Sequence, residues 1–272
     1  MPIITISDHE FTGGNAVAEW VASTLGCPYV TRQILMDTSR RYGLSEAEFA
    51  KFLETAPRRW EGWLRSIEFY RVVLQAAMCE IVQGGHVVYH GQVGQELLPD
   101  IRHVLKVQLI APLEFRVEQL QKREGIDQVA AGRHIKQVDF TRTRRLKTLF
   151  GVDWCDPARY DLVINLGRMA VETASHLVVE AARLEEYQPT AASEQALEDL
   201  RIFAEIKARL FRLPRVGCSS IRVDVEQRNV KLWGLLMAPD LEEEIQILAA
   251  RVSGVRRIST DFEIFSNDSF CP

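Results

Sequence analysis

The segment ISDHEFTGGNAVAE, residues 6–19, has the layout of a phosphate-binding loop. An apolar strand pattern leads into a turn that ends at Gly13-Gly14, and an amphipathic helix pattern begins there. In such loops, backbone N–H groups at a helix N-terminus hold the phosphate. The segment has no Lys and no Ser or Thr after the glycines, and Asp8, His9 and Glu10 crowd the turn. The chain has therefore kept either a nucleotide site or only the fold that once carried it.

The charges of this loop oppose the binding of a triphosphate. A carboxylate 4 Å from a phosphate charge costs ~1 kcal/mol in water and several times more at a partly buried site. The helix dipole favours an anion by only about 0.3–1 kcal/mol. Unless Asp8 and Glu10 point away from the ligand, or Mg²⁺ bridges them, we expect ATP to bind weakly.

Two histidines follow predicted strands and should reach the same cleft, because ligands of parallel sheets lie beyond the carboxyl ends of the strands. His9 and His90, together with Asp8 and Glu10, could hold a divalent metal or act as acid and base. The alternative is that they are ordinary hydrogen-bonded turn residues, since their spacing matches no motif. The expected substrate pocket comprises Asp8, His9, His90 and Gln92.

A helical pattern over residues 126–148 carries a cluster of basic side chains. Its members are Arg133, Lys136, Arg142, Arg144, Arg145 and Lys147. Arg142 and Arg145 share a helix face, and a planar guanidinium suits the oxygens of a phosphate. The other interpretation is a solvated basic helix face, which is the commoner outcome for a run of charges.

The elements that must position these residues alternate along the first two-thirds of the chain. Apolar strand patterns cover residues 3–7, 86–90, 104–110 and 161–165. Helical patterns cover residues 14–25, 31–42, 45–55, 59–83, 112–123, 126–148 and 169–187. Apolar strands separated by helices predict a parallel sheet that is covered on both faces.

The pattern changes after a short polar segment, YQPTAASEQ. A helix is expected over residues 196–211, a hairpin within IRVDVEQRNVKLWG, a helix over 240–252 and a last strand in RISTDFEIF. This order predicts a separate α-β-β-α-β module of about 70 residues, near the lower size limit of an independent fold. The expected domains are residues 1–187 and 196–266, with a linker over 188–195 and a tail over 267–272.

The helix expected over residues 59–83 has an apolar seam with alternating spacings of three and four residues. Its members are Trp60, Trp63, Ile67, Tyr70, Leu74, Ala77 and Ile81. Three heptads are short for a coiled coil, so packing inside the chain is the favoured interpretation. The alternative is a homodimer contact between two copies of this helix.

The amino-acid composition of the chain argues against several classes of protein, among them nucleic-acid-binding, secreted and membrane-spanning proteins. Apolar residues make up 47% of the 272 residues, and the net charge of −4 gives the chain no basic footprint for nucleic acid. We expect no signal peptide and no transmembrane segment, because neither apolar pattern is present. The five scattered cysteines include no CxxC pair, which is typical of reduced thiols in a cytoplasmic protein.

Several of these segments resemble a known family. ITISDHEFTGGNAVAEWVASTLGCPYV is similar to the opening of the cytidylate-kinase-like P-loop proteins, which are relatives of the nucleoside monophosphate kinases. VLKVQLIAPLEFRVEQLQKREGI resembles their central strand and the following helix, and VDFTRTRRLKTLFGVDWCDPARYDLVINLGRM resembles their lid and final strand. The run GVDW-x-DP-x-x-YDLVIN is the most specific match. The resemblance covers roughly residues 1–185.

Residues from Leu197 to Phe265 resemble a BON domain, with VKLWG and ARVSGVRRI in the expected places. BON domains are small α/β modules associated with binding, not with catalysis. The two resemblances together imply an α/β fold: a P-loop kinase-like parallel sheet flanked by helices, followed by a small α-β-β-α-β (BON-like) domain.

The kinase resemblance implies ATP-dependent phosphoryl transfer to a nucleotide, with ATP and Mg²⁺ as cofactors. This chemistry needs a cation on the phosphates, a hydroxyl on Mg²⁺ and lid arginines. The implied catalytic residues are Arg133, Arg142 and Arg145, and the implied cofactor-binding residues are Thr12, Gly13, Gly14 and Asn15. The sequence also departs from the family: Asn15 replaces the basic residue of the loop, Asp8 replaces a usual Arg, and YHGQVG replaces a Gly-Arg-Gly element.

Two functions remain open from the sequence. The first is a kinase of a nucleotide or another phosphate-bearing small molecule, and the lid arginines favour it. The second is a catalytically inactive P-loop fold that serves as a binding or regulatory module beside its BON domain, and Asp8, Glu10 and Asn15 favour it. The sequence slightly favours a kinase-family protein with a degenerate loop, and it leaves the phosphoryl acceptor and the BON ligand open.

Overall fold

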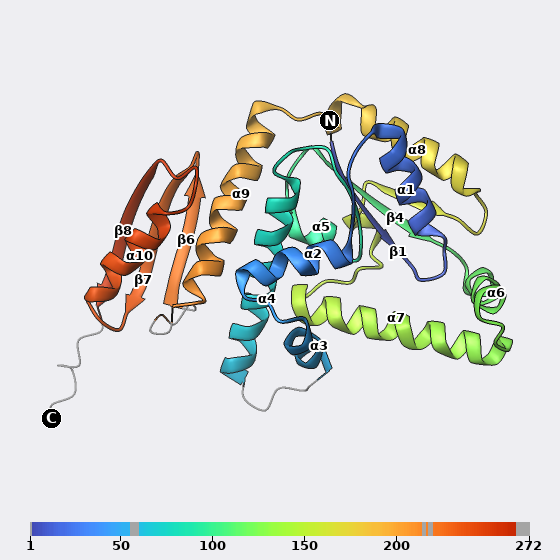
Figure 1. Ribbon diagram of the computed structural model, residues 1–272, viewed down its shortest axis with the longest axis horizontal. Helices are drawn as coiled ribbons and strands as arrows, with labels where there is room; N and C mark the ends of the chain where they lie inside the picture. The colour runs from blue at the N-terminus through green and yellow to red at the C-terminus, as the bar shows by residue number, and fades with distance from the viewer. Residues whose placement is uncertain (1, 55–59, 214–215, 217–219, 265–272) are drawn as a thin grey trace. The chain divides into compact units, whose positions relative to one another are not determined.

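The computed structural model describes residues 2–54, 60–213, 216 and 220–264 (Figure 1). The chain divides into two compact units. The first unit comprises residues 1–35 and 84–190, and the second comprises residues 36–83 and 191–272.

The first unit is built on a five-stranded sheet in the order β2-β3-β1-β4-β5. Its strands are β1 (Ile3–Asp8), β2 (Tyr29–Thr31), β3 (Val88–His90), β4 (Val104–Ile110) and β5 (Leu162–Asn165). Every pairing is parallel, as the alternation of apolar strands with helices predicts. The sequence did not predict β2, because three residues are too short to show a period of two.

Six helices accompany this sheet in the described part of the first unit, apart from short 3₁₀ turns. They are α1 (Gly14–Leu25), the start of α2 (Arg32–Ser39), α5 (Gly94–Leu97), α6 (Leu113–Glu124), α7 (Gln128–Phe150) and α8 (Val171–Arg183). Asp127 caps α7 by accepting from the N–H groups of Val129 and Ala130, which explains where this long helix begins.

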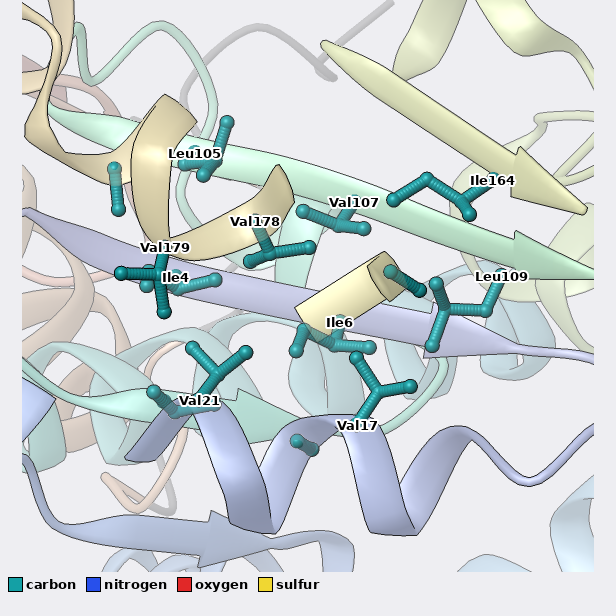
Figure 2. Close-up of a cluster of buried hydrophobic side chains, with 14 of the residues drawn as sticks. Ile4, Ile6, Val17, Val21, Leu105, Val107, Leu109, Ile164, Val178 and Val179 are labelled. Carbon is teal, nitrogen blue, oxygen red and sulfur yellow. The ribbon is translucent and has the colours of Figure 1, made fainter. Parts of the chain in front are cut away.

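The central strand β1 has two chemically different faces. Ile4 and Ile6 pack with Val17 and Val21 of α1 and with Val178 of α8 in a buried apolar cluster (Figure 2). Because side chains alternate along a strand, the intervening Thr5 and Ser7 face the other side, where they are also buried. The apolar face fixes β1 against α1 and thereby fixes the loop that joins them.

The second unit contains the helices α3 (Glu46–Glu54), α4 (Trp60–Val82), α9 (Ala191–Leu210) and α10 (Asp240–Ala250), and the strands β6 (Ile221–Glu226), β7 (Asn229–Leu236) and β8 (Arg257–Ile264). From α9 onward the order is α-β-β-α-β, as the sequence predicts. β6 and β7 form an antiparallel hairpin, and β8 pairs parallel to β7. The Asp199 carboxylate accepts from the backbone N–H groups of Gln227 and Arg228 at 2.9 and 2.7 Å, which fixes the hairpin turn.

Helix α4 belongs to the second unit, although the sequence analysis placed it in the first domain. It packs on α9, with the rings of Phe69 and Phe211 5.6 Å apart. The ammonium of Lys207 on α9 lies 2.6 Å from the carboxylate of Glu68. The alternating spacing of three and four residues reveals an apolar face of α4 but does not indicate which element packs on it.

Most of the apolar seam of α4 that the structure describes is buried in the fold. Tyr70, Leu74 and Ala77 are all buried, and the ring of Tyr70 lies 4.8 and 4.7 Å from those of Phe49 and Phe52. This agrees with the internal-packing interpretation. The side chains of Trp60 and Trp63 lie outside the described part, and the homodimer through residues 59–83 stays a prediction.

The boundary between the units also differs from the predicted linker. Residues 191–195 belong to the start of α9, whereas the polar composition of residues 188–195 predicts a linker. Ala191 and Ala192 are strong helix formers, and they extend the helix beyond the amphipathic pattern that was used to find it. Over the described residues, no helix is both long enough and apolar enough to cross a membrane.

Replacing Glu68 by Ala should destabilise the second unit. The Lys207 side chain is 8% exposed and would lose its carboxylate partner. We expect the free energy of unfolding to fall by about 2 kcal/mol, less than for a fully buried pair because Glu68 is partly exposed. Urea denaturation measures the loss. The double change Glu68→Ala with Lys207→Met, which removes the stranded charge, should recover most of it, and an equal loss in both variants would contradict the assignment.

Candidate functional site

The carboxylate of Asp8, the last residue of β1, folds back over the start of α1. Its Oδ2 lies 3.2 Å from the hydroxyl of Thr12, which is also 2.9 Å from the backbone oxygen of His9, and its Oδ1 lies 3.1 Å from Nε2 of His90. A Cβ atom on Gly14 would lie 2.5 Å from Asp8 Oδ2, so this approach requires glycine. Because the free N–H groups of a helix N-terminus favour an anion, a side-chain carboxylate lies where a phosphate would be attracted.

A hydrogen-bonded chain joins three neighbouring strands at this edge of the sheet. The Tyr29 hydroxyl of β2 lies 3.1 Å from Nδ1 of His90 on β3, and Nε2 of His90 faces Asp8 on β1. A ring whose Nδ1 accepts from Tyr29 and whose Nε2 donates to Asp8 satisfies all three groups. The structure brings Asp8 and His90 together as expected, but both ring nitrogens are engaged, so His90 orients Asp8 here. Tyr29 was missed because β2 was missed.

Arg142 of α7 reaches the loop, where acceptors of the protein surround it. Its guanidinium forms an ion pair with Glu10 and donates to the backbone oxygen of Asp8 at 3.2 Å. With the Gln92 amide in the orientation that its surroundings favour, the side-chain oxygen of Gln92 accepts from Nε and Nη2 of Arg142 at 2.6 and 3.0 Å. The Arg142 side chain is 14% exposed. The cation of the lid therefore faces the loop with its charge balanced by Glu10.

A second arginine, Arg116 of α6, anchors the same loop and was not found from the sequence. It forms a two-pronged pair with Asp139 of α7 at 2.8 and 2.7 Å, and its Nε donates to the backbone oxygen of Glu10 at 2.8 Å. Its side chain is 4% exposed. A signal was present, because Arg116 shares the inward stripe of α6 with Leu113 and Leu120, where a charge needs a partner.

His9 lies beside this arginine, and its ring centroid is 4.8 Å from that of Trp154. Burial lowers the pKa of His9 below the ordinary value of 6.5, and the positive charge of Arg116 lowers it further. The ring is therefore neutral near pH 7. Among the described residues, no group of three or more His, Cys, Asp or Glu side chains is arranged to hold a metal, so the two-histidine metal interpretation gains no support.

The remaining predicted residues lie at different distances from this centre. Thr12 is buried and Gly13 has a left-handed backbone with φ of 92°, whereas Asn15 is exposed on the first turn of α1. Arg145 is half-buried on the turn after Arg142. Arg133 is exposed and precedes Arg142 by nine residues, which places it on the opposite face of α7 and about 13 Å away along the axis.

The parallel sheet with β1 at its centre, and the glycine turn between β1 and α1, define a P-loop kinase-like α/β fold in the first unit. Residues 3–168 match the cytidylate kinase-like family, and the chain belongs to that family. This confirms the resemblance seen in the sequence for the first unit. The matched residues end before α9, so the BON resemblance of the later residues stays a prediction.

Individual relatives agree with this family. The chain is 30% identical over 188 residues to a protein named cytidylate kinase from Methanopyrus kandleri, covering 66% of this chain and 92% of the relative. It is 28% identical over 182 residues to the cytidylate kinase of Methanocaldococcus jannaschii, covering 66% and 96%. A crystal structure of an uncharacterized protein from Eubacterium ventriosum shares the fold, with a TM-score of 0.53 and 18% identity over 66% of this chain and 97% of that one.

Replacing Gly14 by Ala should lower the free energy of unfolding by about 1–3 kcal/mol, because the new methyl group overlaps the Asp8 carboxylate. In a chain that carries Asp8→Gly, the same replacement should be neutral or stabilising, because Ala is the better helix former. Thermal unfolding compares the two backgrounds. Gly132→Ala on α7 is the matched control, since its Cβ would meet only Val117 at 3.8 Å. Equal costs of Gly14→Ala in both backgrounds would contradict this geometry.

The lowered pKa of His9 should make stability depend on pH. Below about pH 6.5 the unfolded chain binds a proton at His9 more readily than the folded chain does, so the free energy of unfolding should fall as the pH falls. In His9→Gln this component of the pH dependence should disappear. Chemical denaturation at several pH values between about 5 and 7.5 measures it, with His176→Gln on exposed α8 surface as the control. Unchanged pH dependence in His9→Gln would show that His9 titrates normally.

Proposed function

We propose that the first unit binds a nucleotide or another phosphate-bearing small molecule and supports little or no phosphoryl transfer from ATP. The observation that carries this proposal is the Asp8 carboxylate, which lies against Gly14 at the N-terminus of α1. The chain keeps the turn at Gly13-Gly14, the buried hydroxyl of Thr12 and the N-terminus of α1. These are the parts of the site that attract an anion.

The loop offers no cation of its own to a triphosphate. Asn15 takes the position at which the family has a basic residue, and it contributes no charge. Asp8 adds a negative charge at hydrogen-bonding distance from Thr12, so the Thr12 hydroxyl is already engaged. A polyphosphate placed on this loop would meet a carboxylate before it met a positive side chain.

Two arginines lie at the site, Arg142 of the lid and Arg116 of α6, and each is paired with a carboxylate of the protein. Arg142 pairs with Glu10, and Arg116 pairs with Asp139. With both pairs neutral, Asp8 leaves the centre with an excess negative charge. A ligand phosphate can gain Arg142 only by displacing Glu10, and this exchange costs part of the binding free energy. We therefore propose a ligand with one phosphate held by Arg142, and we propose ATP and Mg²⁺ only as weak ligands.

Phosphoryl transfer is the second candidate, because the relatives that match the chain over most of their length are named cytidylate kinases. Transfer would require Glu10 to leave Arg142 and Mg²⁺ to neutralise Asp8 beside the phosphates. Arg145, half-buried on the following turn of α7, would be the second lid cation in that state.

For the second unit we propose a BON-like binding module, based on its α-β-β-α-β order and the sequence resemblance. Its ligand is a separate question from the phosphate site. We also propose the cytoplasm as the location of the protein, which the thiol composition favours.

Removing the carboxylate that competes for Arg142 should strengthen phosphate binding. We expect Glu10→Gln to lower the dissociation constant for CMP or Mg-ATP by about fivefold to tenfold in calorimetric titrations, equivalent to about 1–1.4 kcal/mol. Arg142→Ala should weaken any phosphate ligand by about 1.5–3 kcal/mol, the range for a hydrogen bond to a charged group. Both effects are expected because the Glu10 carboxylate and the ligand phosphate compete for the guanidinium of Arg142.

Glu19→Gln is the matched control, because Glu19 is an exposed acid on α1 and the change removes the same charge from the same unit. It should leave binding unchanged. Tight binding of Mg-ATP by the wild type, not improved by Glu10→Gln, would overturn the proposal and show that the acidic residues recruit Mg²⁺ for ATP.

A further inference from the structure

A groove of about 590 Å³ runs beside β5, which is one of the two edge strands of the first unit's sheet. β5 pairs with β4 on one side, and in the described part of the chain no strand pairs with its other side. A free strand edge presents backbone N–H and C=O groups to a partner, and natural proteins usually protect such an edge with charges or cover it. The β5 edge has apolar surroundings instead.

The apolar surface extends over both faces of the strand. Ile164 faces the buried cluster beside α8, so the alternation of side chains puts Val163 on the opposite face, where it is 41% exposed. Leu177 on α8 is 46% exposed, and Leu184, the residue directly after the helix, is 52% exposed. Leu177 and Ala181, four residues apart on α8, lie on one helix face, and together with Leu184 they border the groove. The groove therefore has an apolar border on its helix side and on its strand side.

Opposite charges lie at the two ends of the groove. Helix α8 runs back along β5, because Tyr187, just after the helix, lies near enough to Asp161, just before the strand, for its pKa to be raised by that charge as well as by burial. Arg168 lies at the carboxyl end of β5, and Glu180 lies toward the other end. Among the described residues, Arg168 has no ion-pair partner, and Glu180 contacts only Arg183 of its own exposed helix surface.

This arrangement is self-complementary under a two-fold rotation. If two copies place their β5 edges antiparallel, Arg168 of each copy meets Glu180 of the other, and Leu177 meets its own counterpart near the axis. An isologous interface requires such self-complementarity, in which residue i contacts residue j and j contacts i.

We propose that the β5 edge and the outer stripe of α8 form the interface of a homodimer in which the two five-stranded sheets join through antiparallel β5 strands. The occupant of the groove is a second copy of this chain. This surface is separate from α4, so the proposed dimer is independent of the seam at residues 59–83. It is also independent of the phosphate ligand.

Sedimentation or multi-angle light scattering at micromolar concentration should give twice the chain mass of 31.0 kDa for the wild type. Leu177→Asp places a carboxylate near the axis of the interface and should raise the dimer dissociation constant at least tenfold. The matched control is Val129→Asp at the start of α7, where the side chain is 69% exposed and is not among the residues that line the groove. Thermal unfolding checks that both variants fold.

Charge exchange tests the two-fold geometry directly. Arg168→Glu and Glu180→Arg should each weaken the dimer, because each brings like charges together at both ends of the interface. Mixing the two variants should restore dimers, since one copy then supplies two acidic and the other two basic residues. A monomeric wild type would overturn the proposal. A dimer unaffected by Leu177→Asp, or failure of the mixture to associate when each variant alone is weakened, would overturn it as well.

Discussion

The contact between the Asp8 carboxylate and Gly14 is the constraint on which the site depends. It requires a glycine at the start of α1, a hydroxyl at Thr12 and the imidazole of His90 on the next strand. Tyr29 then fixes His90 from the strand beyond. Because β1 is held against α1 by its apolar face, the carboxylate cannot leave the helix N-terminus without breaking these bonds. The loop has the shape of an anion-binding site, and the Asp8 carboxylate is the anion that lies there.

The two arginine pairs complete this closed arrangement of charge. Arg116 and Asp139 tie α6 to α7 and hold the backbone of Glu10, and Glu10 in turn balances Arg142. Arg116 therefore positions Glu10, the residue that we propose competes with a ligand phosphate for Arg142. A kinase uses a lid guanidinium to stabilise the negative charge that develops on the transferred phosphoryl group. In this structure the charge of the Arg142 guanidinium is already balanced by Glu10. We therefore propose that a phosphate ligand binds Arg142 only as the contact between Glu10 and Arg142 opens.

Sequence patterns predicted the parts of the fold that are governed by local periodicity. The apolar strands, the bounds of α1 and the α-β-β-α-β order of the last residues were all accessible, because burial imposes a period on each. The three-residue strand β2 and the packing of α4 on α9 could not be predicted in this way. A strand this short shows no periodicity, and an apolar stripe does not indicate which element packs on it. At the site, the sequence shows that acidic residues lie close to Gly14. It does not show how Asp8 is oriented, because that depends on Tyr29 and His90, which come together only through the order of the strands in the sheet.

The most direct measurement of the central claim is phosphoryl transfer itself. Phosphorus NMR of wild-type protein with Mg-ATP and CMP follows the loss of ATP and the appearance of nucleoside diphosphates in one spectrum. The closed charge arrangement predicts that the ATP signals stay unchanged over hours at micromolar protein. Conversion at about 1–100 s⁻¹, the range of active kinases, would contradict the account and show that Asp8 and Glu10 leave their partners when substrate binds.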